Sequence, residues 1–283
     1  MSAPNVTPVE VIEITRSGNS KKDDLVTVEE PLEIRLQYFE TSELKEKSIS
    51  VTMRTPGNDL ELALGFLFTE NVISAYKQVD KIFHCKNVKS EEEQGNVVIV
   101  KLVKEVEVDI KKLQRFFYTS SSCGVCGKTS IDAITAGNCQ LLPADSIKVT
   151  PNQIYALPEK LHDAQTTFKH TGGLHAAALF DEKGKLVLVR EDVGRHNALD
   201  KLIGSVLHEA MMPLTKNILL LSGRISFELV QKAVATGVTI LAAVGAPSSL
   251  AIQLAEEFNL TLIGFVKENR FNIYCGGERV VED

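Results

Sequence analysis

The chain has 283 residues, of which 44% are hydrophobic and 24% charged, and its formal net charge is -6. This composition is typical of a globular protein, and the length predicts one domain of about 150 residues with a smaller second one. The negative charge argues against nucleic acid as a partner, because duplex binding generally needs a basic face. The longest apolar runs stay below the ~18 residues of a membrane span, so no membrane association is predicted.

The N-terminal residues and the cysteines indicate the compartment. The first 24 residues contain neither a basic segment followed by a long apolar run nor an Arg-rich transit sequence, which predicts a cytoplasmic location. The cysteines are odd in number and scattered, which does not fit a disulfide framework. We expect free thiols at Cys85, Cys123, Cys126, Cys139 and Cys275.

Short strands with one helix are predicted for residues 9–108. Alternating apolar and β-branched residues indicate strands near 9–15, 25–30, 32–39 and 47–55, and a strand-like run near 95–108 forms one arm of a hairpin. After a turn at 56–59, leucines recur at helical spacing. We assign residues 1–115 to an N-terminal α+β domain whose first ~8 residues are flexible.

Residues 116–283 alternate between helices and strands. Near-continuous apolar strands are separated by amphipathic helices, which predicts a largely parallel sheet covered by helices on both faces. Ligands of such sheets bind beyond the carboxyl ends of the strands. The segments expected there are 191–196, 222–224, 245–248 and 267–270.

Arginine and glycine recur in these four segments, which favours a polyanionic ligand. A purely structural interpretation also holds for their polar residues. Asp192 is suited to capping the following helix, Glu228 and Lys232 have the spacing of a surface pair, and His175 and His196 are each compatible with a structural role.

The stretch TSSSCGVCGK places Cys123 and Cys126 three residues apart among small and polar residues. A structural zinc site needs a second ligand pair, for which His84-Cys85 is the only plausible complement. A thioredoxin-like site normally follows a buried strand, whereas three serines precede this pair. A third interpretation is a nucleophilic sulfur at the start of a helix, where backbone N–H groups and Lys128 favour the thiolate.

Several motifs together resemble one family. SSCGVCGK, TGGLHAAALF, VREDVGRHNALDKLIG, LLSGRISFELVQKA and GFVKENRFNIY occur in the order found in the FdhD family of formate dehydrogenase accessory sulfurtransferases. The resemblance extends from about Pro31 to the C-terminus. It implies an α/β fold with a three-layer, cytidine-deaminase-like larger domain, a smaller N-terminal α+β domain and a homodimeric assembly.

The resemblance also implies a sulfur carrier. Such a protein accepts sulfur from a cysteine desulfurase as a persulfide, here on Cys123 with Cys126 as the accessory thiol. It passes the sulfur to the bis-molybdopterin guanine dinucleotide form of the molybdenum cofactor, of which GDP is a fragment, before this cargo enters the catalytic subunit of formate dehydrogenase. The cofactor-binding stretch corresponds to Phe265, Val266, Lys267, Glu268, Asn269 and Arg270. Asp192 or another loop carboxylate is a candidate acceptor for guanine.

Two departures and two alternatives accompany the resemblance. Glu268-Asn269 stands where we expect Gly-Asp, and no HxE motif of the zinc deaminases occurs. One alternative is a zinc-dependent hydrolase of the deaminase superfamily, with no metal ligands assigned beyond the CxxC. The other is a cofactor-binding chaperone without sulfur chemistry.

Overall fold

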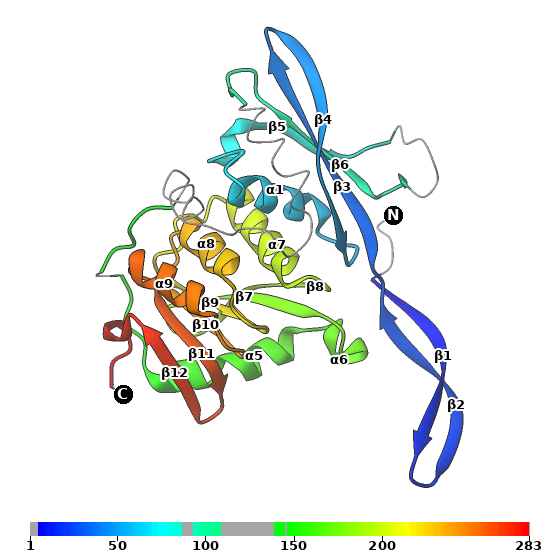
Figure 1. Ribbon diagram of the computed structural model, residues 1–283, viewed down its shortest axis with the longest axis vertical. Helices are drawn as coiled ribbons and strands as arrows, with labels where there is room; N and C mark the ends of the chain where they lie inside the picture. The colour runs from blue at the N-terminus through cyan, green and yellow to red at the C-terminus, as the bar shows by residue number, and fades with distance from the viewer. Residues whose placement is uncertain (1–4, 87–92, 109–138, 145, 283) are drawn as a thin grey trace.

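A computed structural model describes residues 5–86, 93–108, 139–144 and 146–282. Its strands form three sheets, of two, four and six strands, and helices pack between and outside the larger two (Figure 1). None of the helices in these ranges combines the length and apolar character needed to cross a bilayer.

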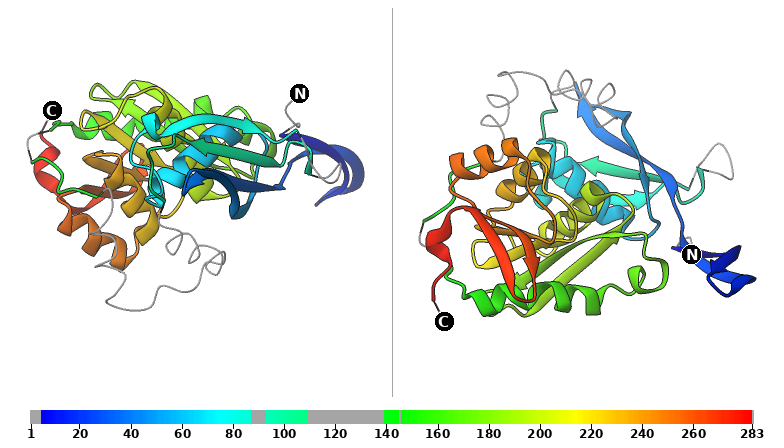
Figure 2. Two further views of the ribbon diagram at one scale, coloured as in Figure 1. Left: turned by 90° about the horizontal axis from the view of Figure 1, so that it is seen from above. Right: turned by 60° about the horizontal axis from the view of Figure 1, so that its bottom comes forward.

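The two-stranded sheet is a hairpin of β1 (Val6–Thr15) and β2 (Gly18–Thr27) that extends away from the rest of the molecule (Figures 1 and 2). We call it the arm. The pairing of β1 with β2 begins at Val6. The expectation that the first eight residues or so are flexible stays a prediction.

The four-stranded sheet has the order β4-β3-β6-β5. Its strands are β3 (Glu30–Glu40), β4 (Glu43–Arg54), β5 (Val79–His84) and β6 (Val97–Leu102). β5 and β6 form the predicted hairpin, and β3 runs parallel to β6. The predicted helix is α1 (Asp59–Thr69), whose apolar residues share one core with those of β3 and β6.

The six-stranded sheet has the order β12-β11-β10-β9-β7-β8. Its strands are β7 (His175–Asp181), β8 (Leu186–Asp192), β9 (Asn217–Leu221), β10 (Ile240–Ala243), β11 (Thr261–Lys267) and β12 (Arg270–Cys275). The prediction of a largely parallel sheet is wrong: only β9, β10 and β11 pair in parallel, whereas β7 and β12 are antiparallel to their neighbours. Short turns join β7 to β8 and β11 to β12, and a short turn can connect only antiparallel strands.

Helices cover both faces of this sheet, as predicted (Figure 1). On one face lie α7 (Arg195–His208), α8 (Phe227–Ala235) and α9 (Ser249–Glu257), and on the other lie α4 (Pro151–Tyr155) and α5 (Leu157–Ala164), followed by the short α6 (Phe168–Thr171). Alternate residues of β9 belong to different cores, Leu219 with the first set of helices and Leu220 with the second. The fold is therefore a layered α/β structure in which the inner strands of the six-stranded sheet, β7, β9, β10 and β11, are buried on both faces.

The N-terminal and C-terminal parts meet where α1 packs against α7. A Cβ atom added to Gly65 of α1 would lie 1.9 Å from the backbone oxygen of Asp200, and one added to Gly204 of α7 would lie 1.8 Å from that of Glu61. The two helices thus approach at backbone distance, which side chains at either position would prevent. The proposed domain boundary at residue 115 lies outside the described residues and stays a prediction.

Candidate functional site

One edge of the six-stranded sheet gathers the segments that the sequence analysis selected. β8 is antiparallel to β7, and β7 is antiparallel to β9, so β8, β9, β10 and β11 all point the same way. Their carboxyl ends therefore lie at one edge, together with the beginnings of β7 and β12. The predicted convergence of the four loops is confirmed.

Backbone hydrogen bonds hold neighbouring loops of this edge together. Gly245 N donates to Gly223 O over 3.2 Å, and Ile225 N donates to Ala246 O over 3.0 Å. A Cβ atom on Gly245 would lie 2.7 Å from Gly223 O, so only glycine permits this approach. The edge is thus a closely packed layer of backbone.

Phe265 continues this layer in a strained conformation. Its φ is 55°, in the left-handed region that bulky residues avoid, and its N–H donates to Gly245 O over 3.0 Å. The pairing of β11 with β12 is irregular here, between Gly264 and Lys267, and 38% of Phe265 is exposed. Such strain is typical of functional sites, where the surrounding structure maintains it.

The rest of the predicted cofactor stretch forms the tip of the β11–β12 hairpin. Lys267 lies opposite Arg270 in the strand register, and both are exposed, as are Glu268 and Asn269 in the turn. Val266 differs, because its side chain is 1% exposed and packs in the core beneath the sheet. A ligand at this tip would therefore meet Phe265 and the charged side chains, and Val266 only through its backbone.

Positive charge gathers near the start of β7. Burial lowers the pKa of His175, and the charges of Arg195, His196 and Arg224 lower it further, so the imidazole is neutral at pH 7. Arg195 Nε is buried without a hydrogen-bond partner among the described residues. A buried guanidinium N–H without a partner is costly, and an anionic ligand would satisfy it.

Glu228 lies against His196 at this edge. Glu228 Oε2 lies 3.1 Å from His196 Nε2, which also lies 3.3 Å from Ser226 Oγ. The hydrogen bond from His196 lowers the pKa of Glu228. The predicted surface pair of Glu228 with Lys232 is wrong, since Glu228 faces His196 instead.

Lys232 is buried and belongs to a different cluster. Its Nζ donates to Asp200 Oδ2 over 2.7 Å and to Thr69 Oγ1 over 2.8 Å. Burial alone would lower the pKa of Lys232, but the carboxylates of Asp200 and Glu70 raise it overall, so the ammonium stays charged. This cluster links α8 and α7 to the end of α1.

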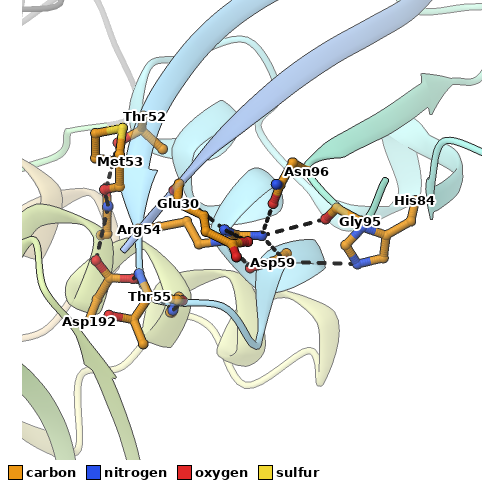
Figure 3. Close-up of polar contacts among 12 residues, drawn as sticks. Glu30, Thr52, Met53, Arg54, Thr55, Asp59, His84, Gly95, Asn96 and Asp192 are labelled. Carbon is orange, nitrogen blue, oxygen red and sulfur yellow. Dashed lines mark hydrogen bonds and ion pairs between the residues drawn. The ribbon is translucent and has the colours of Figure 1, made fainter. Parts of the chain in front are cut away.

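Asp192 is not available to a ligand. It is fully buried, and its carboxylate accepts from Thr55 N over 3.2 Å and from Asn197 Nδ2 over 3.1 Å (Figure 3). Its Oδ2 also lies 2.7 Å from Lys201 Nζ. Asp192 is therefore excluded as the guanine acceptor, whereas the alternative of another loop carboxylate stays a prediction. Asp192 also accepts from Gly194 N over 2.8 Å, but Gly194 is the N-cap of α7 and no side chain caps this helix, so the predicted capping by Asp192 is wrong as well.

Arg54 holds the end of β4 next to buried Asp192. The sequence analysis did not predict this role of Arg54. It is 1% exposed, and its Nε and Nη2 donate to the two oxygens of Asp59 over 2.9 and 3.0 Å (Figure 3). Nη2 also donates to Asn96 Oδ1 over 2.8 Å. Two polar residues at the end of a predicted strand, Arg54 and Thr55, were the only sequence signal. Arg54 fixes the end of β4, from which Thr55 reaches Asp192.

The profile of the FdhD/NarQ family matches residues 27–281. The chain belongs to this family.

Relatives from distant organisms match nearly the whole chain. The sulfur carrier protein FdhD of Streptomyces coelicolor is 47% identical over 272 residues, covering 95% of this chain and 94% of that protein. The protein of the same name from Sulfolobus acidocaldarius is 41% identical over 272 residues, covering 96% of this chain and 97% of that protein. The resemblance stated from the motifs is confirmed.

A solved structure supports the fold. The crystal structure of a proposed formate dehydrogenase accessory protein from Desulfotalea psychrophila superposes with a TM-score of 0.74, covering 98% of this chain and all of that one at 22% identity. The multi-sheet α/β fold is thereby shown for this member of the FdhD/NarQ family. The cytidine-deaminase-like relationship stays a prediction.

Three of the five cysteines of this family member, Cys85, Cys139 and Cys275, lie within the described residues. Cys123 and Cys126 lie outside the described residues. Cys139 and Cys275 are half-buried, and burial raises the pKa of each thiol to about 11. These two thiols are protonated at pH 7 and therefore poor nucleophiles. Within the described ranges no three His, Cys, Asp or Glu side chains are grouped so as to hold a metal ion.

Proposed function

We propose that this protein is a sulfur carrier that acts through a persulfide on Cys123 and serves the maturation of formate dehydrogenase. The observation that carries the proposal is the near full-length similarity to relatives named sulfur carrier protein FdhD. The raised pKa values of Cys139 and Cys275 support it, because they make these two thiols unsuited to sulfur transfer at neutral pH.

In the loading step, the Cys123 thiolate attacks the outer sulfur of a persulfide on a cysteine desulfurase. A bond forms between Cys123 Sγ and that sulfur, the S–S bond of the donor breaks, and the donor cysteine leaves as a thiolate. No external oxidant is needed, because the sulfane sulfur arrives already oxidised relative to sulfide.

In the release step, the Cys126 thiolate attacks Cys123 Sγ. A Cys123–Cys126 disulfide forms, hydrosulfide leaves for the acceptor, and a cellular dithiol then reduces the disulfide. The alternative is direct transfer of the outer sulfur to the acceptor, which leaves Cys123 as a thiolate and gives Cys126 no chemical role.

We propose the guanine dinucleotide form of the molybdenum cofactor as the acceptor and cargo, bound at the edge of the six-stranded sheet. Arg195 with its buried Nε, Arg224, Lys267 and Arg270 supply positive charge there for phosphate groups. Exposed Phe265 offers an aromatic face for a guanine ring. Glu268 is the one carboxylate of the hairpin tip and disfavours phosphate beside it.

Two measurements test the two halves of the proposal. Peptide mass spectrometry after incubation with a cysteine desulfurase and cysteine should place one added sulfur on Cys123. Calorimetry with GDP should show binding that Arg270→Ala weakens. A protein that binds GDP but gains no sulfur would support the chaperone alternative, and one that contains stoichiometric zinc lost on Cys123→Ala would support the hydrolase alternative.

A further inference from the structure

The four-stranded sheet ends in β5, which pairs with β6 on one side only (Figure 1). In this ladder Cys85 N donates to Val97 O over 2.8 Å. Bonded and non-bonded residues alternate along an antiparallel ladder, so the N–H and C=O groups of Ile82 and His84 point away from β6. No other described residue forms a hydrogen bond with these groups. An open edge of this kind is a template for another strand.

A cavity of about 980 Å³ lies along this open edge. Every residue from Lys81 to Lys86 lines the cavity, and successive side chains of a strand point to opposite faces. The cavity therefore passes around the edge of β5 instead of lying over one face of the sheet. Its other side is lined by Leu60 of α1, by Tyr76 and by His208 of α7, and the rings of Tyr76 and His208 are in contact.

This cavity is separate from the edge of the six-stranded sheet. His208, which lines the cavity, is the last residue of α7, whereas His196 lies at the start of α7 and at the sheet edge. The rise of an α-helix places these two residues roughly 18 Å apart along its axis. A ligand in the cavity would therefore leave the proposed cofactor site free.

Positive charge dominates the lining of the cavity. The lining contains Arg35, Lys81 and Lys86 but only one carboxylate, Glu46, although the net charge of the chain is -6. Arg35 is already paired with Glu33 and Glu46. Lys81 and Lys86 are exposed and form no ion pair with a residue of the described ranges. The uncompensated charge of these two lysines favours an anionic partner.

His84 gives a second indication of a ligand. Its Nε2 lies 4.0 Å from Asp59 Oδ2, and 42% of its side chain is exposed (Figure 3). Its Nδ1 is nevertheless buried and has no hydrogen-bond partner among the described residues. Buried polar atoms normally have such a partner. A strand that lies along β5 would bring backbone donors and acceptors close to this ring.

We propose that the open edge of β5 binds an extended acidic segment of another protein, which adds to the four-stranded sheet through the backbones of Ile82 and His84. Alternate side chains of the segment would face the two sides of the sheet. Those on the side of Lys81 meet positive charge, and those on the side of Ile82 meet Tyr76 and the apolar core. The segment that fits best therefore alternates acidic and apolar residues.

A small anion is the alternative occupant of the cavity. It would neutralise Lys81 and Lys86, but it would leave the row of outward N–H and C=O groups on β5 unpaired. The coincidence of these groups with the cavity favours a strand, since backbone hydrogen bonds supply most of the affinity in this type of recognition.

Fluorescence polarisation of the full-length protein with labelled heptapeptides tests the charge preference. A peptide that alternates valine and glutamate should bind about tenfold or more tightly than one that alternates valine and lysine. Lys81→Glu should weaken binding of the glutamate peptide about tenfold, because it brings like charges together. Lys216→Glu makes the same charge change at an exposed position outside the cavity and should leave the affinity unchanged.

A proline in β5 tests the strand pairing. Ile82→Pro removes the outward N–H but no hydrogen bond to β6, so an edge strand tolerates it. It should weaken binding of the glutamate peptide about tenfold relative to Ile82→Ala, which loses the side chain but keeps the N–H. Circular dichroism checks that both variants are folded. In the wild type, bound glutamate peptide should slow hydrogen exchange in residues 79–86.

Three results would overturn the proposal. They are a glutamate peptide that does not bind, equal binding of the glutamate and lysine peptides, and hydrogen exchange of residues 79–86 that the bound peptide leaves unchanged. Equal affinities of Ile82→Pro and Ile82→Ala would also overturn strand addition and would favour the small-anion alternative. None of these outcomes depends on sulfur transfer or on GDP.

Discussion

Lys201 of α7 and Asp192 at the end of β8 form a buried ion pair in which Nζ lies 2.7 Å from Oδ2, with the two side chains 2% and 0% exposed. The pair is shared with the N-terminal part of the chain, since Lys201 Nζ also donates to Thr55 O over 2.8 Å and Asp192 accepts from Thr55 N. It fixes the loop that leads into Arg195 and His196. The positions of Arg195 and His196 at the sheet edge therefore depend on contacts with the end of β4.

We predict that Lys201→Met destabilises the protein by about 3–5 kcal/mol, because it leaves the Asp192 carboxylate buried without its counter-charge. Urea unfolding followed by circular dichroism measures the loss. Lys21→Met is the matched control, since its pair with Glu10 is mostly exposed and should contribute less than about 1 kcal/mol. Equal effects of the two substitutions would contradict the structural role of the buried pair.

The close packing of α1 against α7 gives a second prediction. Gly204→Ala should reduce the free energy of unfolding by about 1–3 kcal/mol, because the added methyl group would overlap the backbone of Glu61 in α1. Gly277→Ala is the control, as its Cβ would lie 3.7 Å from the nearest side chain. If both variants unfold at the wild-type urea concentration, α1 and α7 do not meet as closely as described.

The pKa values of two thiols predict their reactivity. At pH 7 a thiol with a pKa of about 11 has a thiolate fraction of ~0.0001, so Cys139 and Cys275 should react slowly with iodoacetamide. Their alkylation should accelerate roughly tenfold per pH unit until pH approaches 11. Peptide mass spectrometry of native and urea-denatured protein measures this, and equally fast labelling in both states at pH 7 would refute it.

The same two shifts predict a loss of stability at alkaline pH. Burial raises the folded-state pKa of each thiol from its ordinary value of 9.0 to about 11, so between these pH values the folded state keeps a proton that the unfolded state loses. Stability should be unaffected by these groups below about pH 9 and fall between about pH 9 and pH 11. Cys139→Ala/Cys275→Ala should flatten this part of a pH-dependent unfolding curve, whereas an unchanged slope would assign it to other groups.

Phe265 combines a strained backbone conformation with the proposed contact to the guanine ring. Phe265→Gly should weaken GDP binding about tenfold or more, because stacking on an aromatic ring contributes roughly 1–3 kcal/mol per base. Glycine adopts the left-handed conformation without strain, which compensates for lost packing, so the free energy of unfolding should change by less than about 1 kcal/mol. Phe83→Ala, in the four-stranded sheet and 39% exposed, should leave GDP affinity unchanged.

Local patterns predicted the elements well, because hydrophobic spacing directly reflects which side of a strand or helix is buried. The helix from Asp59, the β7–β8 hairpin and the alternating elements after Arg195 were all expected. The antiparallel direction of β7 relative to β9 was not expected, since both strands are buried and a continuous apolar run does not reveal the direction of its neighbour. The parallel pairing of β3 with β6 likewise depends on contacts far apart in the sequence.

The polar residues show why the site was only partly predictable. The loops at the sheet edge were predicted because each follows an apolar strand, and the family motif indicated the hairpin tip. Asp192 and Lys232 were misassigned, because helical spacing places Lys232 beside Glu228 while tertiary packing directs it to Asp200. Nothing in the local sequence distinguishes a buried charge from a surface charge when its partner lies in another segment.

The most direct test of the sulfur-carrier account is the mass of Cys123 after incubation of the full-length protein with a cysteine desulfurase and cysteine. The account predicts a gain of one sulfur on the peptide containing Cys123, absent from Cys123→Ala and retained in Cys126→Ala. Cys139→Ala/Cys275→Ala, which removes the two weakly reactive thiols, should load as the wild type does. An unmodified Cys123 under conditions in which the desulfurase itself carries a persulfide would contradict the account.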